Sequence, residues 1–502
     1  LRLVHLDLKG AAPRVSYLEQ VRGAAARRCG PPHPAACRVP CALQLFPLLS
    51  QLGASGILLE YEDMFPFRGE LETLRSPYAY SEEDVERIQQ LAELNRLEVV
   101  PLVQTFGHAE VGGRGDAAGA GTRGRPLPGA PPAQYILKHD KYRHLREVER
   151  FPNSFNPRAP GTLPLLRSLL AQVMEKHGRS GWIHIGADEV FHLGEGAESR
   201  AWMSRTKGDV GALYLEHVKA VASAVAAPGR RALMWDDMLR RMSAGALRGE
   251  RVPGGAAGPH GRVLSACPPP RRVGHRPARL ARRVVLRAGL RRRARGYVGT
   301  WVRWRGPCTA PAPLTGPAAA GPFLAKYAES GFGAVWYDHY AVLCELLPVG
   351  VPSLALCLQT LANGGFTEAT KRRVLDALGF HSIHLEQSTC EGTGAFPGAQ
   401  IYRLVEQVNG HLKESVAQLL EEESAVKGWF SPYHRRRRFG NPRNLESFGS
   451  RLLKLHEDWQ AVERSLRAQL AAVYFPDTVD EWLEENVSPY LEPLRELLRD
   501  YR

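Results

Sequence analysis

Near-continuous apolar strands alternate with helices along most of this 502-residue chain, and this alternation limits the fold more than any other feature. The sequence predicts strands over residues 3–8, 56–61, 99–105, 182–186, 232–235 and 333–336. Helical spacing of apolar residues predicts helices between them, over 45–52, 163–177 and 212–226. Ser81 with Asp84 three residues later predicts another helix start. Strands of this kind indicate a parallel sheet that is buried on both faces.

Polar or acidic residues follow five successive strands at the point where each apolar run stops, as Glu62, His108 and Asp188 do. A doubly wound sheet gathers its site at a switch point, commonly beside a glycine-rich phosphate loop. No G-x-G-x-x-G motif or P-loop follows any of these strands. Groups from many strands that converge on one face are typical of a (β/α)8 barrel. We therefore predict an α/β fold of the (β/α)8 TIM-barrel type over residues 1–394.

A C-terminal α-helical region is expected over residues 395–502, because apolar residues there recur at helical spacing and no strand pattern remains. The periodicity predicts helices over 401–419, 453–473 and 479–501.

Three segments rich in Ala, Gly, Pro and Arg interrupt the barrel, at residues 21–43, 111–133 and 243–322. Such composition buries little apolar surface, so disorder is expected. They are interpreted either as basic interaction loops or as translated intron or frame-shifted sequence, and the second interpretation is favoured because they break regular structure abruptly. The third segment occupies the place of barrel strands six and seven, which we expect to be disrupted.

The positive charge is concentrated in one part of the chain. The net charge is +14, but residues 240–305 carry 18 arginines and one acid, which leaves −3 on the other 436 residues. The body of the protein therefore lacks the basic surface of a nucleic-acid or membrane binder. Arg435–Arg438 are expected to form a solvated loop. No run of 18 apolar residues predicts a membrane span.

The eight cysteines do not form a convincing metal motif. Cys37-x3-Cys41, with Cys29 and His33 nearby, lacks the Cys-x2-Cys spacing of a zinc knuckle. Unpaired thiols are expected instead, as in a reducing compartment. No signal-peptide pattern is present at Leu1, so the expected location is the cytoplasm or nucleus.

Asp188 and Glu189 are the strongest catalytic candidates. They follow the apolar strand of the segment WIHIGADE directly. Neighbouring residues of a regular strand point to opposite faces, so both can line one site only if the strand ends before them. Two adjacent carboxyls then divide their roles, one ionised and one protonated. The alternative is a helix cap and a first-turn acid.

Several motifs, taken in order along the chain, resemble the β-N-acetylhexosaminidases of glycoside hydrolase family 20, and within it the hexosaminidase D subgroup. They are LVHLDLKG, LLEYEDMFPFRG, VVPLVQTFGH, HIGADEV, MWDDML, YDHYAVLCELLP and GWFSPYHR.

The resemblance implies hydrolysis of terminal β-linked GalNAc or GlcNAc with net retention, through an oxazolinium intermediate formed by the substrate's own acetamido group. It implies that Asp188 orients the acetamido group and that Glu189 is the general acid and base. The mechanism that the resemblance implies requires no metal or organic cofactor.

The resemblance also implies substrate-binding residues at other strand ends, namely His108, Trp235, Trp336 and Lys9. Glu62, after the second strand, is placed either to reach the same site or to cap a helix. The family's pocket tyrosine would fall in the third interrupting segment, where Tyr297 is a poor match.

The expected partner is a glycan or glycoconjugate, without nucleic acid or membrane, and a homodimer is left open. Two alternatives remain beside the enzyme: an inactive glycan-binding relic or faulty gene model of it, and a basic nucleic-acid-binding protein that uses residues 240–305.

Overall fold

The computed structural model describes residues 2–19, 45–109, 136–235, 237–240, 242, 346–363, 367–384 and 389–502, together with the backbone of four further strand segments at 264–265, 285–287, 302–303 and 333–337. Residues 21–43 and 111–133 lie outside this set, as does most of 243–322. So do Tyr297, His33 and the cysteines at 29, 37 and 41.

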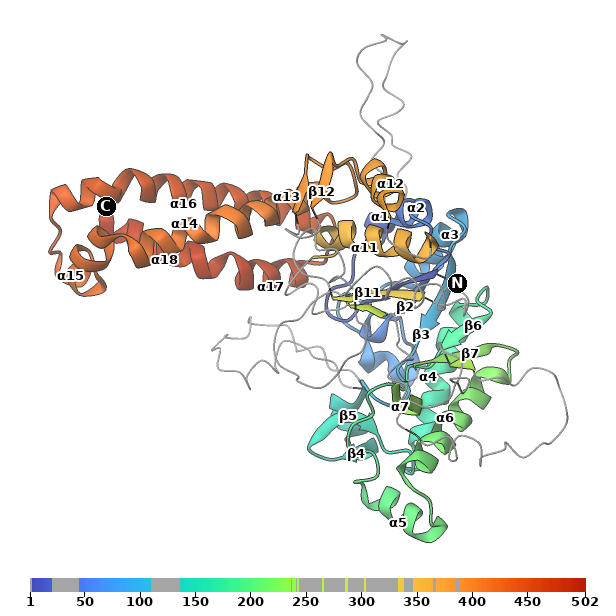
Figure 1. Ribbon diagram of the computed structural model, residues 1–502. Coiled ribbons are helices and arrows are strands. Elements are labelled where there is room, and N and C mark those ends of the chain that lie inside the picture. The colour runs from blue at the N-terminus through green and yellow to red at the C-terminus, as the bar shows by residue number, and fades with distance from the viewer. Residues whose placement is uncertain are drawn as a thin grey trace, which may run out of the picture.

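The centre of the molecule is a nine-stranded sheet in the order β10-β9-β11-β1-β2-β3-β6-β7-β8, in which all paired strands are parallel (Figure 1). The strands are β1 (Arg2–Asp7), β2 (Gly56–Glu60), β3 (Glu98–Leu102), β6 (Trp182–His184), β7 (Arg231–Met234), β8 (Leu264–Ser265), β9 (Val285–Arg287), β10 (Val302–Arg303) and β11 (Gly333–Tyr337). The expected α/β fold with a parallel sheet is confirmed.

Residues 243–322, where disorder and disrupted strands are expected, contribute three short strands, β8, β9 and β10, to the sheet. They are two or three residues long, too short to produce a recognisable apolar run. Arg287 in β9 and Arg303 in β10 also interrupt the apolar pattern from which strands are predicted.

Helices separate the strands along the chain. They are α1 (Val15–Leu18), α2 (Leu45–Gln51), α3 (Glu82–Leu94), α4 (Thr162–Lys176), α5 (Ala197–Thr206), α6 (Val210–Ala226), α7 (Asp237–Arg240), α11 (Leu347–Asn363) and α12 (Glu368–Leu378). Short 3-10 turns follow β2 and β3, at Glu62–Met64, Gly69–Leu74, Ile136–Lys138 and Asp140–Leu145. Two small antiparallel pairs complete this part: β4 (Arg146–Val148) with β5 (Phe151–Phe155), and β12 (Ser382–His384) with β13 (Thr389–Glu391).

The two faces of the sheet contribute to two separate apolar clusters, as the alternation of side chains along a strand requires. One cluster consists of Leu3, Leu58, Val100, Leu102, Trp182, Leu233 and Trp235 from five adjacent strands. Residues at the alternate positions, among them Val4, Ile57, Leu59 and Ile183, pack with the helices in the main core. Two residues after Leu3, Leu58 and Leu102, on the same face, the chain has His5, Glu60 and Gln104. These are polar groups of the site described below.

The C-terminal helices form an arm that extends away from the sheet, with α15 at its far end (Figure 1). Its elements are α13 (Ala399–Gln407), the π-helical turns η7 (Val408–Leu412), η8 (Gln418–Glu422) and η9 (Ala425–Trp429), α14 (Lys413–Ala417), α15 (Pro432–Arg437), α16 (Pro442–Ala471), α17 (Pro476–Asn486) and α18 (Ser488–Tyr501). The predicted helix over 479–501 is two helices, because α17 ends at Asn486 and α18 begins at Ser488. Pro489 has no backbone N–H to donate to the preceding turn, so it cannot continue α17. The predicted boundary at 394/395 lies between β13 and α13.

The cysteines differ in state. Cys357 is a buried free thiol within α11, as expected. Cys390 is disulfide-bonded, so the expectation of unpaired thiols is wrong at that position. No helix in the described part of the chain is long and apolar enough to cross a membrane.

Candidate active site

Asp188 and Glu189 stand on a sharp turn that follows β6. Gly186, Ala187 and Glu189 have φ angles of 65°, 69° and 44°, so the strand has ended before the carboxyls, as their shared site requires. A left-handed backbone is costly for residues other than glycine and persists only where surrounding contacts hold it. The Tyr214 hydroxyl donates to the Ala187 carbonyl at 2.7 Å, which is one such contact.

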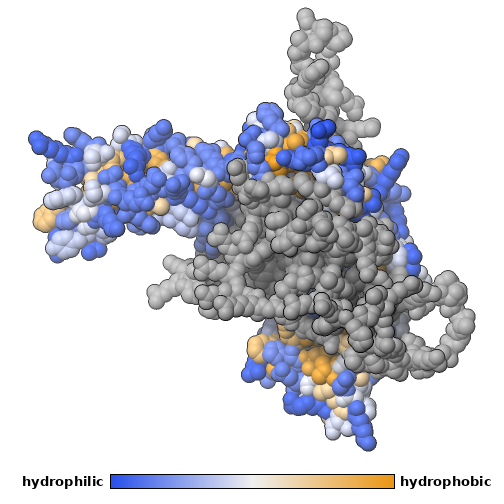
Figure 2. Space-filling model, viewed as in Figure 1, coloured by the Kyte–Doolittle hydropathy of each residue, from blue (hydrophilic) through white to orange (hydrophobic). Residues whose placement is uncertain are grey.

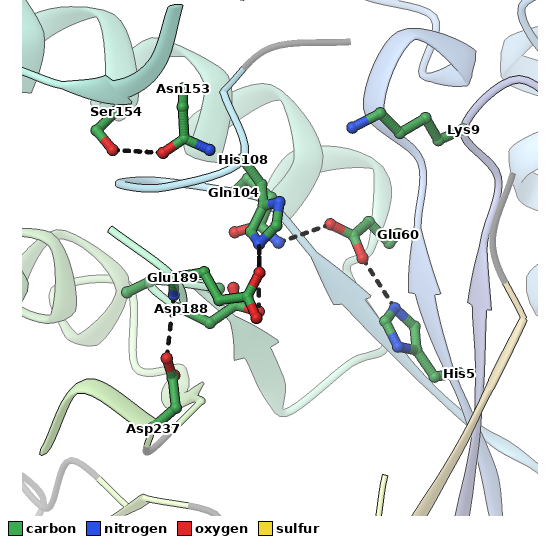
Figure 3. A network of polar contacts seen from close by, with 12 residues as sticks. His5, Lys9, Glu60, Gln104, His108, Asn153, Ser154, Asp188, Glu189 and Asp237 are labelled. Atoms are coloured by element: carbon green, nitrogen blue, oxygen red, sulfur yellow. Dashed lines mark hydrogen bonds and ion pairs between the residues drawn. The ribbon is translucent and has the colours of Figure 1, made fainter. Parts of the chain in front are cut away.

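A second contact holds the turn from the neighbouring strand end. The Glu189 backbone N–H donates to Oδ2 of Asp237 at 3.1 Å, across from β6 to the start of α7 (Figure 3). Asp237 belongs to the acidic pair that follows β7, and it supports the catalytic candidates through their backbone.

The two carboxyls differ in exposure. The Asp188 side chain is 7% exposed and that of Glu189 is 39% exposed. Asp188 is therefore enclosed by protein, while Glu189 reaches towards solvent. The pair therefore combines one carboxyl that is screened from water with one that can exchange protons with solvent.

His108 joins this pair from the end of β3 (Figure 3). Its Nε2 lies 3.4 Å from Oε2 of Glu189 and 3.7 Å from Oδ2 of Asp188. Burial alone would lower the pKa of His108, but the Asp188 charge and the hydrogen bond with Glu189 raise it to about 9. The imidazole is therefore a cation at neutral pH, facing two carboxyls. The approach is close because residue 107 is glycine: a Cβ there would lie 2.2 Å from the Asp188 carbonyl oxygen.

A buried polar layer lies at the same end of the sheet, centred on Glu60 at the end of β2. Glu60 Oε2 is 2.9 Å from His5 Nε2, and Glu60 Oε1 accepts from Gln104 Nε2 at 2.9 Å. Burial, and then the neighbouring Asp188 charge, raise the pKa of Glu60 to about 7. Gln104 packs against the turn of the pair, since a Cβ on Gly186 would lie 2.0 Å from Gln104 Oε1. The layer thus connects β1, β2 and β3 to the catalytic turn.

Lys9 and Glu62 form the third side of the group. Lys9 Nζ lies 3.6 Å from Glu62 Oε1, and burial raises the pKa of Glu62 well above its usual range, partly offset by the Lys9 charge. Burial likewise raises the pKa of the adjacent Asp63 to about 7, and Lys9 opposes that shift as well. Lys9 is therefore a cation placed among several buried carboxyls.

Trp235 directly follows β7 and belongs to the apolar cluster on one face of the sheet. The centre of its indole ring lies 4.2 Å from the ring centre of His184 and 5.7 Å from that of His5. Its backbone N–H donates to the Gly186 carbonyl at 3.0 Å. Trp235 therefore packs against both the polar layer and the turn that carries the pair.

Six of the seven predicted site residues, all except Trp336, belong to this group at the strand ends. The backbone of Trp336 lies in β11, opposite His5 of β1, but its side chain lies outside the described residues. Sequence reasoning did not select Glu60, His5, Gln104 and Asp237. A signal existed for His5 and Glu60, which stand two residues after Leu3 and Leu58 and therefore share their face.

Within the described part of the chain, no group of three or more His, Cys, Asp or Glu residues is arranged to hold a metal ion. The chemistry available from these residues is acid–base and electrostatic: two carboxyls of unequal exposure, one imidazolium and one ammonium group.

Comparison with known proteins adds the family. The model of the glycosyl hydrolase family 20 catalytic domain matches residues 39–251. Hexosaminidase D of Homo sapiens is 39% identical over 532 aligned residues, which span 100% of this chain and 94% of that protein. Hexosaminidase D of Bos taurus is 38% identical over 400 residues, 76% of this chain and 98% of that protein.

Among solved structures, the β-N-acetylhexosaminidase of Bacteroides fragilis is 18% identical with a TM-score of 0.32, over 48% of this chain and 42% of that one. The extent of the human match, together with the family model, is sufficient for the assignment: this chain belongs to glycosyl hydrolase family 20, alongside the hexosaminidase D proteins, and is a glycoside hydrolase.

Proposed function

We propose that the protein is a retaining exo-β-N-acetylhexosaminidase that removes terminal β-linked GalNAc or GlcNAc by substrate-assisted catalysis. The observation that carries this proposal is the unequal burial of Asp188 and Glu189 on one turn beside His108. A retaining enzyme that supplies its own nucleophile places two carboxyls on opposite sides of the scissile bond. Adjacent residues on a single turn fit better with a nucleophile that belongs to the substrate.

In the first step, the carbonyl oxygen of the substrate's 2-acetamido group attacks the anomeric carbon. The bond to the leaving oxygen breaks, and Glu189 gives that oxygen its proton. The ring formed on the sugar is an oxazolinium cation, and the enclosed carboxylate of Asp188 accepts a hydrogen bond from its N–H and stabilises its charge. An electrostatic interaction of this kind is strong in a site that excludes water.

In the second step, Glu189 takes a proton from a water molecule, which attacks the anomeric carbon. The bond from that carbon to the acetamido oxygen breaks, so the acetamido group is regenerated and the configuration is retained. The exposure of Glu189 suits this exchange with leaving group and water. The His108 cation, 3.4 Å away, stabilises the carboxylate form that Glu189 holds between the steps.

The other strand-end residues are proposed to bind the sugar. Lys9 and Glu62 offer a cation and a carboxyl for ring hydroxyls, and Trp235 offers an apolar surface beside the catalytic turn. Trp336, on the strand next to β1, is proposed to complete the pocket.

We also propose that the parallel sheet closes as a (β/α)8 barrel. The apolar cluster that Leu3, Leu58, Val100, Trp182 and Leu233 form apart from the main core resembles the layered interior of such a barrel. Its polar continuation at the carboxyl ends of the strands is where barrels of this kind place their active sites.

Release of nitrophenol from β-GlcNAc and β-GalNAc nitrophenyl glycosides tests the function. The wild-type chain is expected to turn over at least one of them, and Glu189→Gln is expected to lower kcat by about 10²–10⁴-fold, the usual contribution of a general acid and base. Retention is read from the anomer that first appears in the NMR spectrum of the product.

The matched control is Glu195→Gln, six residues along the chain in an exposed turn beside His192, which is expected to keep wild-type turnover. Folded protein without turnover would support the glycan-binding relic instead. Turnover that survives in Glu189→Gln would contradict the assignment of the acid.

A further inference from the structure

The far end of the C-terminal arm is strongly basic. From the second half of η9 to the start of α16, residues 427–443 contain six lysines and arginines and no acidic residue. We call residues 427–443 the arm tip. It lies at the opposite end of the arm from the sheet (Figure 1), so it is remote from the catalytic pair.

Three large aromatic side chains are exposed on the arm tip. Trp429, Tyr433 and Phe439 are 61%, 52% and 62% exposed. Apolar and hydrophilic residues therefore lie side by side at the end of the arm (Figure 2). All three rings lie within the short segment 429–439, and exposed apolar residues that are grouped in this way mark interaction sites more often than single ones do.

The arm tip is held in shape from within. Phe430, between the exposed aromatics in sequence, is buried against Phe448 with ring centres 5.8 Å apart. Arg435 pairs with Asp500 of α18 at 2.9 Å, and Ser431 Oγ lies 3.1 Å from His434 Nδ1. These contacts fix the arm tip, so that presenting the aromatics to a partner costs little additional ordering.

The other arginines of this segment indicate the charge of the partner. The expected solvated loop is wrong for Arg435–Arg437, which belong to helix α15. Arg436, Arg437 and Arg438 are exposed, and within the described residues none of them forms an ion pair. The Arg437 guanidinium lies 4.0 Å from the centre of the Tyr433 ring, so cation and aromatic are presented together. The partner that complements this surface is anionic and has an apolar layer beneath its charge.

We propose that the arm tip is a docking surface for anionic lipid membranes, on which the enzyme binds peripherally. Tryptophan and tyrosine favour the boundary between headgroups and hydrocarbon, and each basic residue near an anionic bilayer adds attraction. The tip is a projection at the end of an arm, which suits a flat and fluid surface. Single-stranded nucleic acid is instead bound along a basic groove with stacked bases, whereas the basic residues of the arm tip lie on a projection.

Vesicle co-sedimentation of the full chain tests this proposal, with phosphatidylcholine vesicles and with equal parts of phosphatidylcholine and phosphatidylserine. One variant removes the aromatics (Trp429→Ser, Tyr433→Ser, Phe439→Ser), and another reverses charge (Arg436→Glu, Arg437→Glu). Binding is expected only with phosphatidylserine, and each variant is expected to weaken it roughly tenfold or more. Turnover of a soluble nitrophenyl glycoside is expected to stay unchanged, because the tip is remote from the site.

The matched control changes an equally exposed apolar residue and two exposed arginines elsewhere: Leu94→Ser, Arg167→Glu and Arg205→Glu. It is expected to bind as the wild type does. Equal binding by the tip variants would overturn the proposal and assign the binding to another basic segment, such as 240–305. Absence of binding to phosphatidylserine vesicles, or binding to single-stranded RNA in its place, would overturn it too. Vesicle binding is read without turnover, so it stands or fails independently of the catalytic assignment.

Discussion

Glu60 has an unusual position for an acidic residue, because it is 3% exposed at the end of a strand in the middle of the sheet. A buried carboxylate is costly unless hydrogen bonds and cations compensate for the lost water. Gln104 donates one hydrogen bond to it, and His108 and Lys9 contribute positive charge. These effects do not fully offset burial and the Asp188 charge, so the pKa of Glu60 rises from its usual 4.5 to about 7.

The sign of the resulting pH dependence follows directly. Between pH 4.5 and 7 the folded protein holds a proton on Glu60 that the unfolded chain has released, so this residue lowers stability as pH rises through that window. Glu60→Gln stays neutral at every pH. We expect the free energy of unfolding of this variant, measured with urea, to rise relative to that of the wild type between pH 5 and 7.5, by at most about 3 kcal/mol.

The control for this measurement is Glu496→Gln, on an exposed face of α18, which is expected to follow the wild-type curve. A difference between wild type and Glu60→Gln that does not change with pH would show that Glu60 keeps one charge state throughout.

Among single residues, the site groups that follow strands could be predicted from the sequence, but Glu60, the last residue of β2, was not selected. Asp188, Glu189 and His108 were predictable because each stands where an apolar run stops. Glu60 ends such a run itself, and its contacts with His5 on β1 and with Gln104 after β3, both distant in sequence, show that it belongs to the site. Pairing between strands is not visible in a single sequence.

The start of α3 is the clearest local signal among the elements. The Ser81 hydroxyl accepts from the Asp84 N–H at 3.0 Å, and Asp84 Oδ2 accepts from the Ser81 N–H at 2.9 Å. Such a reciprocal pair satisfies two backbone donors that the helix itself cannot satisfy.

Ser81→Ala removes one of these bonds and is expected to lower the free energy of unfolding by about 1 kcal/mol, measured as a lower thermal midpoint. Turnover at a temperature where both proteins are folded should not change. Ser168→Ala, at an exposed position within α4, is the matched control and is expected to be neutral. Equal losses from both variants would argue against a capping role.

Element positions were largely predictable, and element ends were less so. The strand predicted over 99–105 spans Glu98–Leu102, and the one predicted over 182–186 stops at His184. In both cases the apolar pattern continues into a loop that stays buried, at Val103 and Ile185. The apolar pattern indicates which residues are buried, and the buried residues extend beyond those that pair in the sheet.

The arm and the sheet are joined by specific polar contacts as well as by apolar packing. The Tyr17 hydroxyl donates to the Pro397 carbonyl, and the Arg14 side chain donates to the carbonyls of Ala471 and Tyr474. The Tyr474 hydroxyl accepts from the backbone N–H of Leu347, the first residue of α11, at 2.9 Å. That N–H has no partner within its own helix, so the arm caps a helix of the sheet region.

Tyr474→Phe leaves this buried donor unsatisfied, which is expected to cost about 1–3 kcal/mol. Because the bond joins two parts of the molecule, unfolding followed by tryptophan fluorescence and by turnover should separate into two transitions. Tyr490→Phe is the matched control: this ring stacks on Trp459 within the arm and is expected to keep one transition at the wild-type midpoint. A single, unshifted transition in Tyr474→Phe would show that apolar packing alone couples the parts.

The central place of β1 in the sheet has a consequence for the making of the protein. Leu3 pairs with the Gly56 region on one side but with Ala334 on the other. At about 5–20 residues per second, a ribosome delivers that second partner roughly 15–65 s after the first strand has emerged. During this interval the newly made half of the sheet presents an unpaired strand edge, which invites pairing with other chains. The risk of aggregation is therefore concentrated in the period of translation, and chaperones that bind nascent chains would shield this edge until β11 arrives.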